Sequence, residues 1–378
     1  MEVCNLKKNK IIKLIRWGLL SLFLLMITIQ GYLHQVKGGG EAPSVHALCP
    51  YGALESLYSL IGSGTFIQKI YSGTVILFLI TIVIALLFRR SFCGLICPFG
   101  ALQEFFGLFG KKLFKKKFEM PRMFDNYLRY LKYVILLITI YYAWKTAGLW
   151  MSPYDPWAAY AHLSEGISSL ISENLVGFIL LIVTVIGSIL YDRFFCKYLC
   201  PMGALYGIIS KISAHKIVRN ENKCINCNLC TKNCPMNIDV AKSNNITSSE
   251  CINCQLCVLS CPKEDCLKTK QFTKTLKPSF TLGLVILVFL SGILISKSVG
   301  IYNILPESIP AGKTISVDDV RGYMTLNEVA NGLKIDIKKL YEKLNIPEDV
   351  PKDTKFKEVR NFIPGFSDEN AKDILRKN

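Results

Sequence analysis

Five stretches of the chain contain few charged side chains and are rich in Leu, Ile, Val and Phe. Each is about 18 to 23 residues long, enough for a helix to cross the ~30 Å hydrocarbon core of a bilayer. The pattern predicts a mainly α-helical, polytopic membrane protein, and we interpret the first stretch as a retained anchor because no small-residue cleavage site follows it. The predicted spans are residues 11–33, 70–88, 129–150, 174–191 and 279–296.

The 378-residue chain carries a formal net charge of +17, and its basic residues are unevenly placed. They cluster before the first span, in residues 89–128 and between the fourth and fifth spans, whereas residues 151–173 contain no Lys or Arg. By the positive-inside rule, we expect the N-terminus and both basic loops in the cytoplasm, and residues 34–69, 151–173 and the C-terminal segment outside. We interpret the basic residues mostly as topology determinants that contact lipid headgroups, and we exclude nucleic acid as a partner.

Residues 224–262 contain the run C-x2-C-x2-C-x3-C-P twice. Eight thiolates at this spacing suit two [4Fe–4S] clusters, and the fourth Cys of each run normally ligates the other cluster. The duplicated run and the Pro after each fourth Cys favour a bacterial-type 2[4Fe–4S] ferredoxin domain over a zinc or disulfide scaffold. The predicted ligands are Cys224, Cys227, Cys230 and Cys261 for the first cluster and Cys251, Cys254, Cys257 and Cys234 for the second.

A second repeat lies in the predicted membrane part. Residues 92–106 and 195–209 share the pattern F-C-x3-C-P-x-G-A-L at an offset of 103 residues. The same offset aligns residues 49–60 with residues 152–163, and the second span with the fourth. We therefore expect two copies of one two-helix unit, related by a pseudo-two-fold axis along the membrane normal.

The repeated C-x3-C-P motif suggests chemistry of its own. Pro98 and Pro201 suit the first turn of a helix, so Cys97 and Cys200 would lie at helix N-termini, where the dipole favours a thiolate. Pseudo-symmetry would bring all four cysteines together as ligands of a further iron–sulfur cluster or metal, as redox dithiols, or as buried thiols that pack helix ends. The four residues are Cys93, Cys97, Cys196 and Cys200.

The outer loops hold candidates for a quinol site, because quinol oxidation needs a proton acceptor beside an apolar slot. Cys49 with His46 also permits a metal or haem site, although such a loop is more often a re-entrant or interfacial turn, which the shared Pro-Tyr supports. We interpret Trp150 and Trp157 mainly as interfacial anchors. The candidate residues are His46, Cys49, Tyr51 and Glu55 in one copy and Tyr154, Asp155, Trp157 and His162 in the other.

The C-terminal segment differs in composition, being polar with helical periodicity and without Cys or His. Thr325 followed by Glu328 predicts a helix cap, Gly332 a turn between two short helices, and residues 368–377 a further helix. We interpret the segment as a small outer helical module for interactions. The predicted domains are the four-span membrane domain (1–215), the ferredoxin domain (216–270), the fifth transmembrane helix (271–298) and the outer module (299–378).

The two C-x3-C-P motifs followed by the double ferredoxin run resemble the NapH/NosR group of polytopic 4Fe–4S membrane proteins, which includes the CcoG-type accessory proteins. The resemblance covers residues 11–270 and implies electron transfer between the quinone pool and a redox partner, or assembly of a metalloenzyme. The large flavin-binding extension of the NosR branch is missing, so no flavin is expected. We predict a multi-pass membrane electron-transfer protein whose own quinol dehydrogenase activity is left open, with a maturation factor or redox sensor as alternatives.

Overall fold

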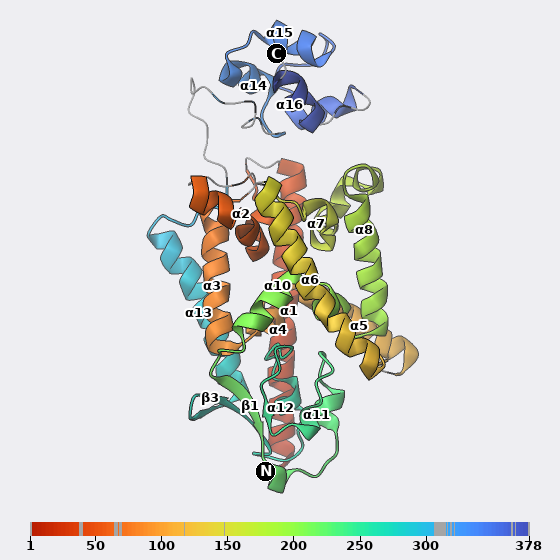
Figure 1. Cartoon of the computed structure of the whole chain (residues 1–378), viewed down its shortest axis with the longest axis vertical. Coiled ribbons are helices and arrows are strands. Elements are labelled where there is room, and N and C mark those ends of the chain that lie inside the picture. The colour runs from red at the N-terminus through yellow and green to blue at the C-terminus, as the bar shows by residue number, and fades with distance from the viewer. Residues whose placement is uncertain are drawn as a thin grey trace. The chain divides into compact units, whose positions relative to one another are not determined.

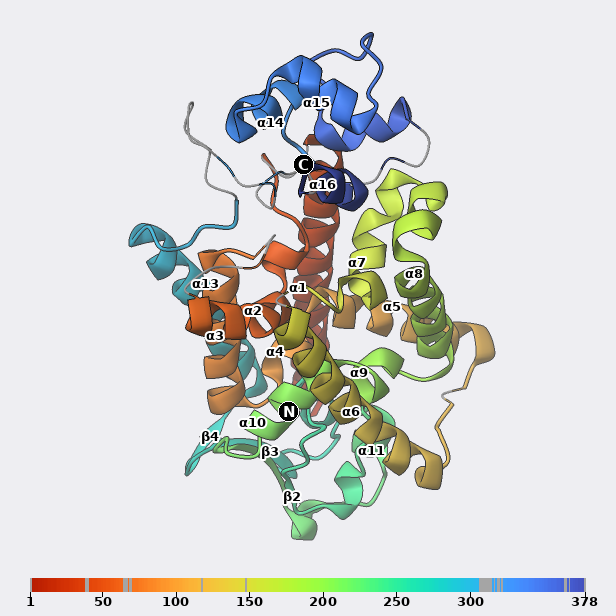
Figure 2. The same cartoon turned by 45° about the horizontal axis from the view of Figure 1, so that its top comes forward.

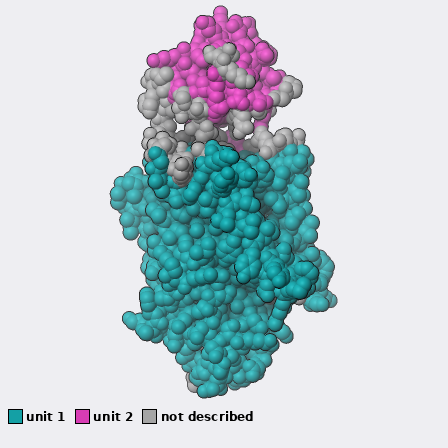
Figure 3. Space-filling model, in the orientation of Figure 1, with its two compact units in different colours: residues 1–32, 45–304 teal, residues 33–44, 305–378 magenta. Residues whose placement is uncertain are grey.

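The computed structural model describes residues 2–37, 41–63, 67, 70–116, 118–146, 148–305, 315, 317, 320, 322–363, 366 and 368–376. The chain divides into two compact units, which Figure 3 shows in different colours. Unit 1 contains residues 1–32 and 45–304, and unit 2 contains residues 33–44 and 305–378. The ferredoxin segment therefore belongs to the same compact unit as the apolar helices, and the finer domain boundaries stay a prediction.

Most of unit 1 is helical (Figure 1). The order α3, α4, α5 recurs as α8, α9, α10, which is the arrangement that the duplication predicts. The helices are α1 (Glu2–Lys37), α2 (Pro50–Ser63), α3 (Ser72–Phe88), α4 (Ser91–Leu95), α5 (Pro98–Phe114), α6 (Arg122–Thr146), α7 (Pro156–Ala161), α8 (Ile167–Leu190), α9 (Phe194–Tyr198), α10 (Pro201–Ile209) and α13 (Pro278–Ser298).

Two of the described helices are long and apolar enough to cross a membrane, namely Asn9–Lys37 within α1, and α13. Helix α3 and the segment Asn174–Leu190 of α8 are apolar but shorter. Asn174 has non-helical angles (φ −136°, ψ 38°), so α8 is kinked where the predicted fourth span begins. Helix α6 is continuous and contains most of the third predicted span, but its sequence includes charged residues such as Arg129 and Lys132. Five membrane crossings therefore stay a prediction.

The ferredoxin segment contains an antiparallel four-stranded sheet in the order β2-β1-β3-β4. Ile217 of β1 pairs with Ile246 of β2 and Thr269 of β3, and its side chain packs among the buried cysteines. The segment lies at the N-terminal end of α1, where Lys13 donates a hydrogen bond to Ser260 at 2.9 Å (Figures 1 and 2). The strands are β1 (His215–Arg219), β2 (Asn245–Ile246), β3 (Leu267–Gln271) and β4 (Lys274–Leu276), and the short helices are α11 (Leu229–Lys232) and α12 (Leu256–Leu259).

The ferredoxin segment is held against the first repeat by the turn between α3 and α4. Asn253 donates to the carbonyl oxygen of Phe88 at 3.1 Å and to the hydroxyl of Ser91 at 2.7 Å. Gly94 packs so closely against the carbonyl oxygen of Ile252 that a Cβ would not fit. Only glycine at this position permits the approach of the two backbones.

Unit 2 has its own apolar core around Leu326, Leu340 and Phe356. The predicted capping box is confirmed, since Glu328 N–H donates to Thr325 Oγ1 at 3.1 Å and Thr325 N–H to Glu328 Oε2 at 2.9 Å. The prediction for Gly332 is wrong: it lies inside a helix, where a Cβ would come within 2.6 Å of Ile315, and the turn begins at Lys334 (φ 55°). The helices are α14 (Leu326–Leu333), α15 (Ile337–Leu344) and α16 (Asp368–Arg376).

Candidate functional site

The eight ferredoxin cysteines line two separate cavities, and each cavity combines three cysteines of one run with the fourth of the other. The structure thus brings together the groups that crossed ligation requires. Neither cavity has a carboxylate or imidazole among its described lining residues, so the donor sets are the soft thiols that suit iron–sulfur clusters. The first cavity is lined by Cys224, Cys227, Cys230 and Cys261, and the second by Cys234, Cys251, Cys254 and Cys257.

Both cysteine runs have residues with positive φ angles at equivalent positions. Asn226 and Asn253 occupy equivalent positions with φ of 53° and 49°, and Asn228 and Gln255 follow with 59° and 63°. Asparagine tolerates this left-handed region better than most residues, which explains three of these four choices. The paired geometry shows that the two halves of the segment fold alike.

Cys266 is a fifth thiol in the first cavity, which sequence reasoning did not explain. It is 3% exposed, and its Sγ donates weakly to the carbonyl oxygen of Asn220 at 3.8 Å. No motif includes it, so only the strand pairing that brings β3 beside the cavity reveals its place.

The C-x3-C-P cysteines lie at the positions that the motif predicts. Cys97 and Cys200 are the N-caps of α5 and α10, each followed by Pro in the first turn, and Gly203 N–H donates to Cys200 Sγ at 3.3 Å. Burial first, and then the nearby sulfurs of Cys196, Cys93 and Cys97, raise the pKa of the Cys200 thiol. The charges of the other three C-x3-C-P cysteines thus act on Cys200.

The two copies interlock through their arginines. A Cβ on Gly100 would lie 2.7 Å from Nη1 of Arg193, and a Cβ on Gly203 would lie 2.7 Å from Nη2 of Arg90. Arg90 and Arg193 are equivalent under the repeat, as are the two glycines. Each copy thus covers a glycine of the other with its arginine, as a pseudo-two-fold axis requires.

Glu104 binds two buried guanidinium groups. It accepts hydrogen bonds from Arg16 at 2.7 Å and from Arg193 at 2.7 Å, while Arg193 also donates to the carbonyl oxygen of Cys93 at 2.6 Å. Burial alone would raise the pKa of Glu104, but the two arginines outweigh it and lower the pKa to about 2. Glu104 is therefore an anion that joins α1, α5 and the start of α9.

Glu250 has the corresponding role beside the second ferredoxin site. It accepts from Lys132 at 2.5 Å and from Arg90 at 3.3 Å. Our interpretation of the basic residues as headgroup contacts is consequently wrong for several positions, because these side chains are buried inside the protein. These residues are Arg16, Arg89, Arg90, Arg193 and Lys197, each at most 2% exposed.

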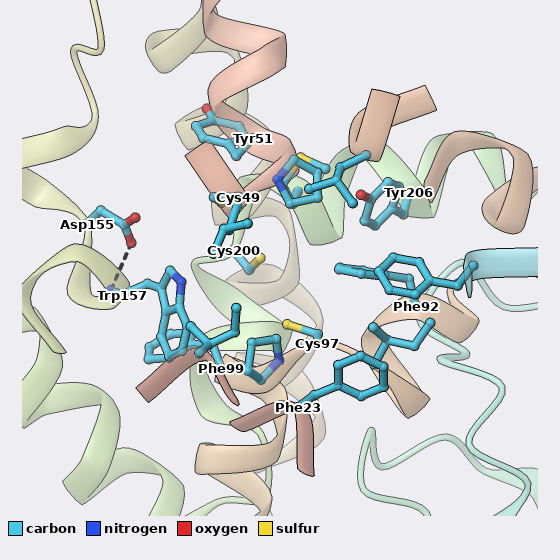
Figure 4. A pocket seen from close by; sticks show the side chains of 18 of the residues that line it. Phe23, Cys49, Tyr51, Phe92, Cys97, Phe99, Asp155, Trp157, Cys200 and Tyr206 are labelled. Atoms are coloured by element: carbon cyan, nitrogen blue, oxygen red, sulfur yellow. Dashed lines mark hydrogen bonds between the residues drawn. The ribbon is translucent and has the colours of Figure 1, made fainter. Parts of the chain in front are cut away.

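An apolar cavity of about 200 Å³ lies among α1, α2, α5, α10 and α13 (Figure 4). Asp155 is the one carboxylate among its described lining residues, which also include three cysteines and three tyrosines. Asp155 accepts a hydrogen bond from the backbone N–H of Trp157 at 2.9 Å, drawn as a dashed line. The aromatic side chains that line the cavity are Phe23, Tyr51, Phe92, Phe99, Trp157, Phe195, Tyr206, Phe289 and Tyr302, and the thiols are Cys49, Cys97 and Cys200.

The candidate quinol-site residues fall into two groups. Cys49, Tyr51, Asp155 and Trp157 line the cavity. The interpretation of Trp157 as an interfacial anchor is wrong, because it is 8% exposed and stacks on Tyr160 with ring centroids 5.2 Å apart.

The remaining candidates lie outside the described cavity lining. His46 Nε2 shares a hydrogen bond with Ser152 Oγ at 3.0 Å, which joins the two copies. Tyr154 is 37% exposed, and His162 is half-buried in the turn after α7. The aromatic residues from α1 and α13 were not predicted, although Phe92 is the repeated Phe of the C-x3-C-P motif.

Two carboxylates near the cavity have raised pKa values, which suit them to exchange protons near neutral pH. Burial raises the pKa of Asp155 to about 6, opposed by the backbone N–H groups of Trp157 and Ala158. Burial, with the charge of Asp155 as a smaller cause, raises the pKa of Glu55 to about 8 despite the hydrogen bond from Met151 N–H at 3.0 Å. Both groups thus change protonation near neutral pH.

Comparison with protein families agrees with this geometry. Residues 73–120 and 173–220 match the family described as 4Fe–4S binding domain, and residues 216–262 match the 4Fe–4S dicluster domain. The double match to the first family confirms the predicted duplication. Two cysteine-lined cavities in a ferredoxin-type segment, together with these family matches, define an iron–sulfur protein of the electron-transfer class.

Three relatives each match about half of this chain, and no solved structure matches it. YccM of Escherichia coli K12, provisionally named an electron transport protein, is 34% identical over 50% of this chain and 53% of its own, so about half of its length is matched. The uncharacterized proteins MJ0749 and MJ0750 of Methanocaldococcus jannaschii are each 32% identical, over 49% and 52% of this chain and 68% and 76% of their own. The chain belongs to the family of ferredoxin-type 4Fe–4S proteins that includes MJ0749 and MJ0750.

Proposed function

We propose that this protein is a membrane-bound electron carrier that connects quinol, bound in the apolar cavity, with a redox partner at the ferredoxin segment. The observation that carries the proposal is the cavity itself, whose aromatic lining contains one carboxylate at Asp155 and the thiol of Cys97. Pockets for apolar ligands commonly combine such a lining with a few orienting polar groups. The NapH-like resemblance adds to this reading.

A membrane location is supported by the surfaces of the two longest apolar helices. Leu22 and Leu25 of α1 are each 58% exposed, and Leu287 and Leu294 of α13 are 62% and 65% exposed. Apolar side chains exposed at this density suit lipid rather than water. Together with the positive-inside pattern, they support a multi-pass protein with a cytoplasmic ferredoxin segment and an outer C-terminal module.

The chain's own residues account for the proton chemistry. Oxidation of one quinol gives one quinone, two protons and two electrons. The Asp155 carboxylate, in contact with the cavity, accepts a proton from the quinol hydroxyl, and Glu55 lies near enough to feel its charge and serve the second proton. The [4Fe–4S] clusters, when bound, supply carriers that take up one electron at a time.

The structure offers a short route away from the cavity. Cys97 lines the cavity, and Gly94, three residues earlier, packs against the backbone of Cys254 at the second ferredoxin site. Cys227 of the first site is exposed, which suits contact with a soluble partner. These contacts support passage from cavity to surface.

Reconstitution with a quinol analogue tests the proposal. Anaerobically purified protein in liposomes is mixed with a reduced or oxidised quinone, and the visible absorbance and electron paramagnetic resonance of the iron–sulfur centres are followed. We expect exchange, and we expect Trp157→Ala to weaken quinol binding while Trp150→Ala, outside the cavity lining, leaves it unchanged. Absence of exchange with any quinone would favour the maturation role instead.

A further inference from the structure

The ferredoxin segment has a polar groove on its sheet, with a volume of about 540 Å³. We propose that an acidic, soluble electron-carrier protein docks in this groove and exchanges electrons with the first ferredoxin cavity. The inference deepens the proposed function and rests on it for the existence of a redox partner. The sheet groove, as it is called below, is lined by Arg219, Glu221, Asn245, Asp265, Lys268 and Lys270, among others.

The two faces of the sheet carry different side chains, because neighbouring residues of a strand point to opposite faces. On the inner face, Ile217 packs among the buried cysteines. On the outer face, Lys216 of β1 is the antiparallel partner of Lys270 of β3. The next pair on that face joins Val218 to Lys268. Three lysines are therefore gathered on the side of the sheet that turns away from the cysteines.

Lys216 and Lys270 form a like-charge pair across the two strands. Like charges directly opposite each other destabilise an antiparallel pair. Neither ammonium group has an ion-pair partner among the residues that the structure describes. An anionic ligand on this face would relieve the repulsion between them.

The acidic side chains that line the sheet groove already have partners within it. Glu221 pairs with Arg219 at 3.2 Å, and Asp265 pairs with Lys268 at 3.0 Å. These two carboxylates therefore balance two other cations. The charge of Lys270 is left for a ligand.

The ferredoxin segment as a whole also carries an excess of positive charge. Residues 211–277 contain eleven Lys and Arg but only five Asp and Glu. One of the acids, Glu250, is buried and already paired with Lys132. Such an excess attracts an oppositely charged protein over a distance and speeds its encounter. The carrier that fits this surface is therefore acidic.

The sheet groove shares a wall with the first ferredoxin cavity. Arg219, at the end of β1, lines both. Along β3, Leu267 lines the cavity and Lys268 lines the groove, so one strand lies between them. Cys266 Sγ in the cavity lies 3.8 Å from the carbonyl oxygen of Asn220, a residue of the groove. A carrier in the groove is thus one strand away from the cysteines of the first cavity.

The electron count follows from the proposed quinol chemistry. One quinol gives two protons and two electrons in the apolar cavity, and only the electrons reach the ferredoxin segment. Two one-electron carriers are therefore reduced in turn at the sheet groove for each quinol oxidised. No bond is made or broken in the groove itself.

Anionic lipid is the other ligand that a basic surface attracts, and the sheet groove suits it less. Glu221 and Asp265 place negative charge among the lysines, and a protein surface of mixed charge can pair with both signs. Four asparagines also line the groove, and their amides both donate and accept hydrogen bonds. Such a polar lining is typical of the rim of a protein interface.

The test uses the full-length protein in nanodiscs of zwitterionic lipid, with an acidic soluble [2Fe–2S] ferredoxin as the probe. We expect salt-sensitive binding of this probe, and we expect it to protect Lys216 and Lys270 from acetylation. The double variant Lys216→Glu with Lys270→Glu should weaken binding about tenfold or more. The matched control, Lys112→Glu with Lys115→Glu, makes the same charge change at the exposed end of α5 and should weaken binding less than about twofold.

Equal losses of affinity in the two double variants would overturn the proposal, because only the overall charge would then attract the probe. Absence of binding by the acidic probe would also overturn it. Nanodiscs that contain anionic lipid provide a further arm: protection of Lys216 and Lys270 without any probe would assign them to the membrane surface instead. Binding is measured without quinol, so intact groove binding in a protein that does not exchange electrons with quinol would refute only the proposed function.

Discussion

Asn253, which lies between two predicted ligands of the second cluster, donates a hydrogen bond to the hydroxyl of Ser91 at 2.7 Å, two residues before Cys93. The same amide donates to the carbonyl oxygen of Phe88, and its oxygen contacts His215 Nε2 at 3.1 Å. One side chain thus joins a ferredoxin loop to the first C-x3-C-P element.

Replacing Asn253 by Ala is expected to destabilise the protein by about 1–3 kcal/mol, because buried partners lose their hydrogen bonds. Asn226→Ala is a matched control, since Asn226 has the same φ sign and motif position but is exposed. Backbone strain is common to both variants, so their difference in thermal unfolding reports the lost bonds. Equal unfolding temperatures would show that the docking contact contributes nothing.

Glu104→Gln is expected to cost about 3–5 kcal/mol, because it leaves two buried guanidinium groups without their anion. The surface pair between Arg219 and Glu221, whose carboxylate side chain is 60% exposed, provides the comparison. Glu221→Gln should change the free energy of unfolding by less than about 1 kcal/mol. Denaturant unfolding under anaerobic conditions measures both, and similar losses would contradict the role of Glu104.

Asp155→Asn is expected to slow quinol oxidation about 100-fold or more, since an amide cannot accept the proton. Because the pKa of Asp155 is raised to about 6, the wild-type rate should rise with pH through that value as the carboxylate forms. The rate of the variant should not rise with pH through this value. Asp349→Asn, on the surface of unit 2, should keep both the wild-type rate and its rise with pH.

His215 predicts a pH dependence of stability. Burial lowers its pKa below the ordinary 6.5, opposed by hydrogen bonds with Gln271 and Asn253 and aided by the nearby charge of Arg89. As the pH falls below about 6.5, the unfolded chain binds a proton that the folded protein does not, so the free energy of unfolding decreases.

His215→Gln should flatten that part of the stability curve. Thermal unfolding at several pH values between 8 and 5.5 would measure the slope, within the range where histidine titrates. His162→Gln, a half-buried imidazole elsewhere, should keep the wild-type slope. Parallel curves for the wild type and the His215 variant would refute the assignment.

The parts of the structure that could be predicted were those that short sequence motifs determine. The Pro-started helices after Cys97 and Cys200 and the Thr325 cap depend on residues a few positions apart, and each C-x2-C-x2-C-x3-C-P run is a short motif. The duplication could be predicted because its two copies share identical residues at one constant offset. Each motif is contained in a short stretch of chain, and the duplication follows from comparing two such stretches.

Long-range pairing decided what could not be predicted. Arg16 has the position of a headgroup contact, and only the fold shows that Glu104, 88 residues away, binds it. The cavity is likewise lined by Phe23 and Phe289, which come from helices near the beginning and the end of the unit 1 sequence. A hydropathy pattern contains no information about which apolar faces meet around an empty volume.

The crossing of Arg90 over Gly203 and of Arg193 over Gly100 has an evolutionary consequence. A shorter ancestor with one copy of the unit would have formed the same contacts by pairing with an identical subunit. In a single chain the two halves need not stay identical, and here Cys49 corresponds to Ser152 and Glu104 to Gly207. This asymmetry puts an acidic anchor in one copy and a small residue at the equivalent place in the other.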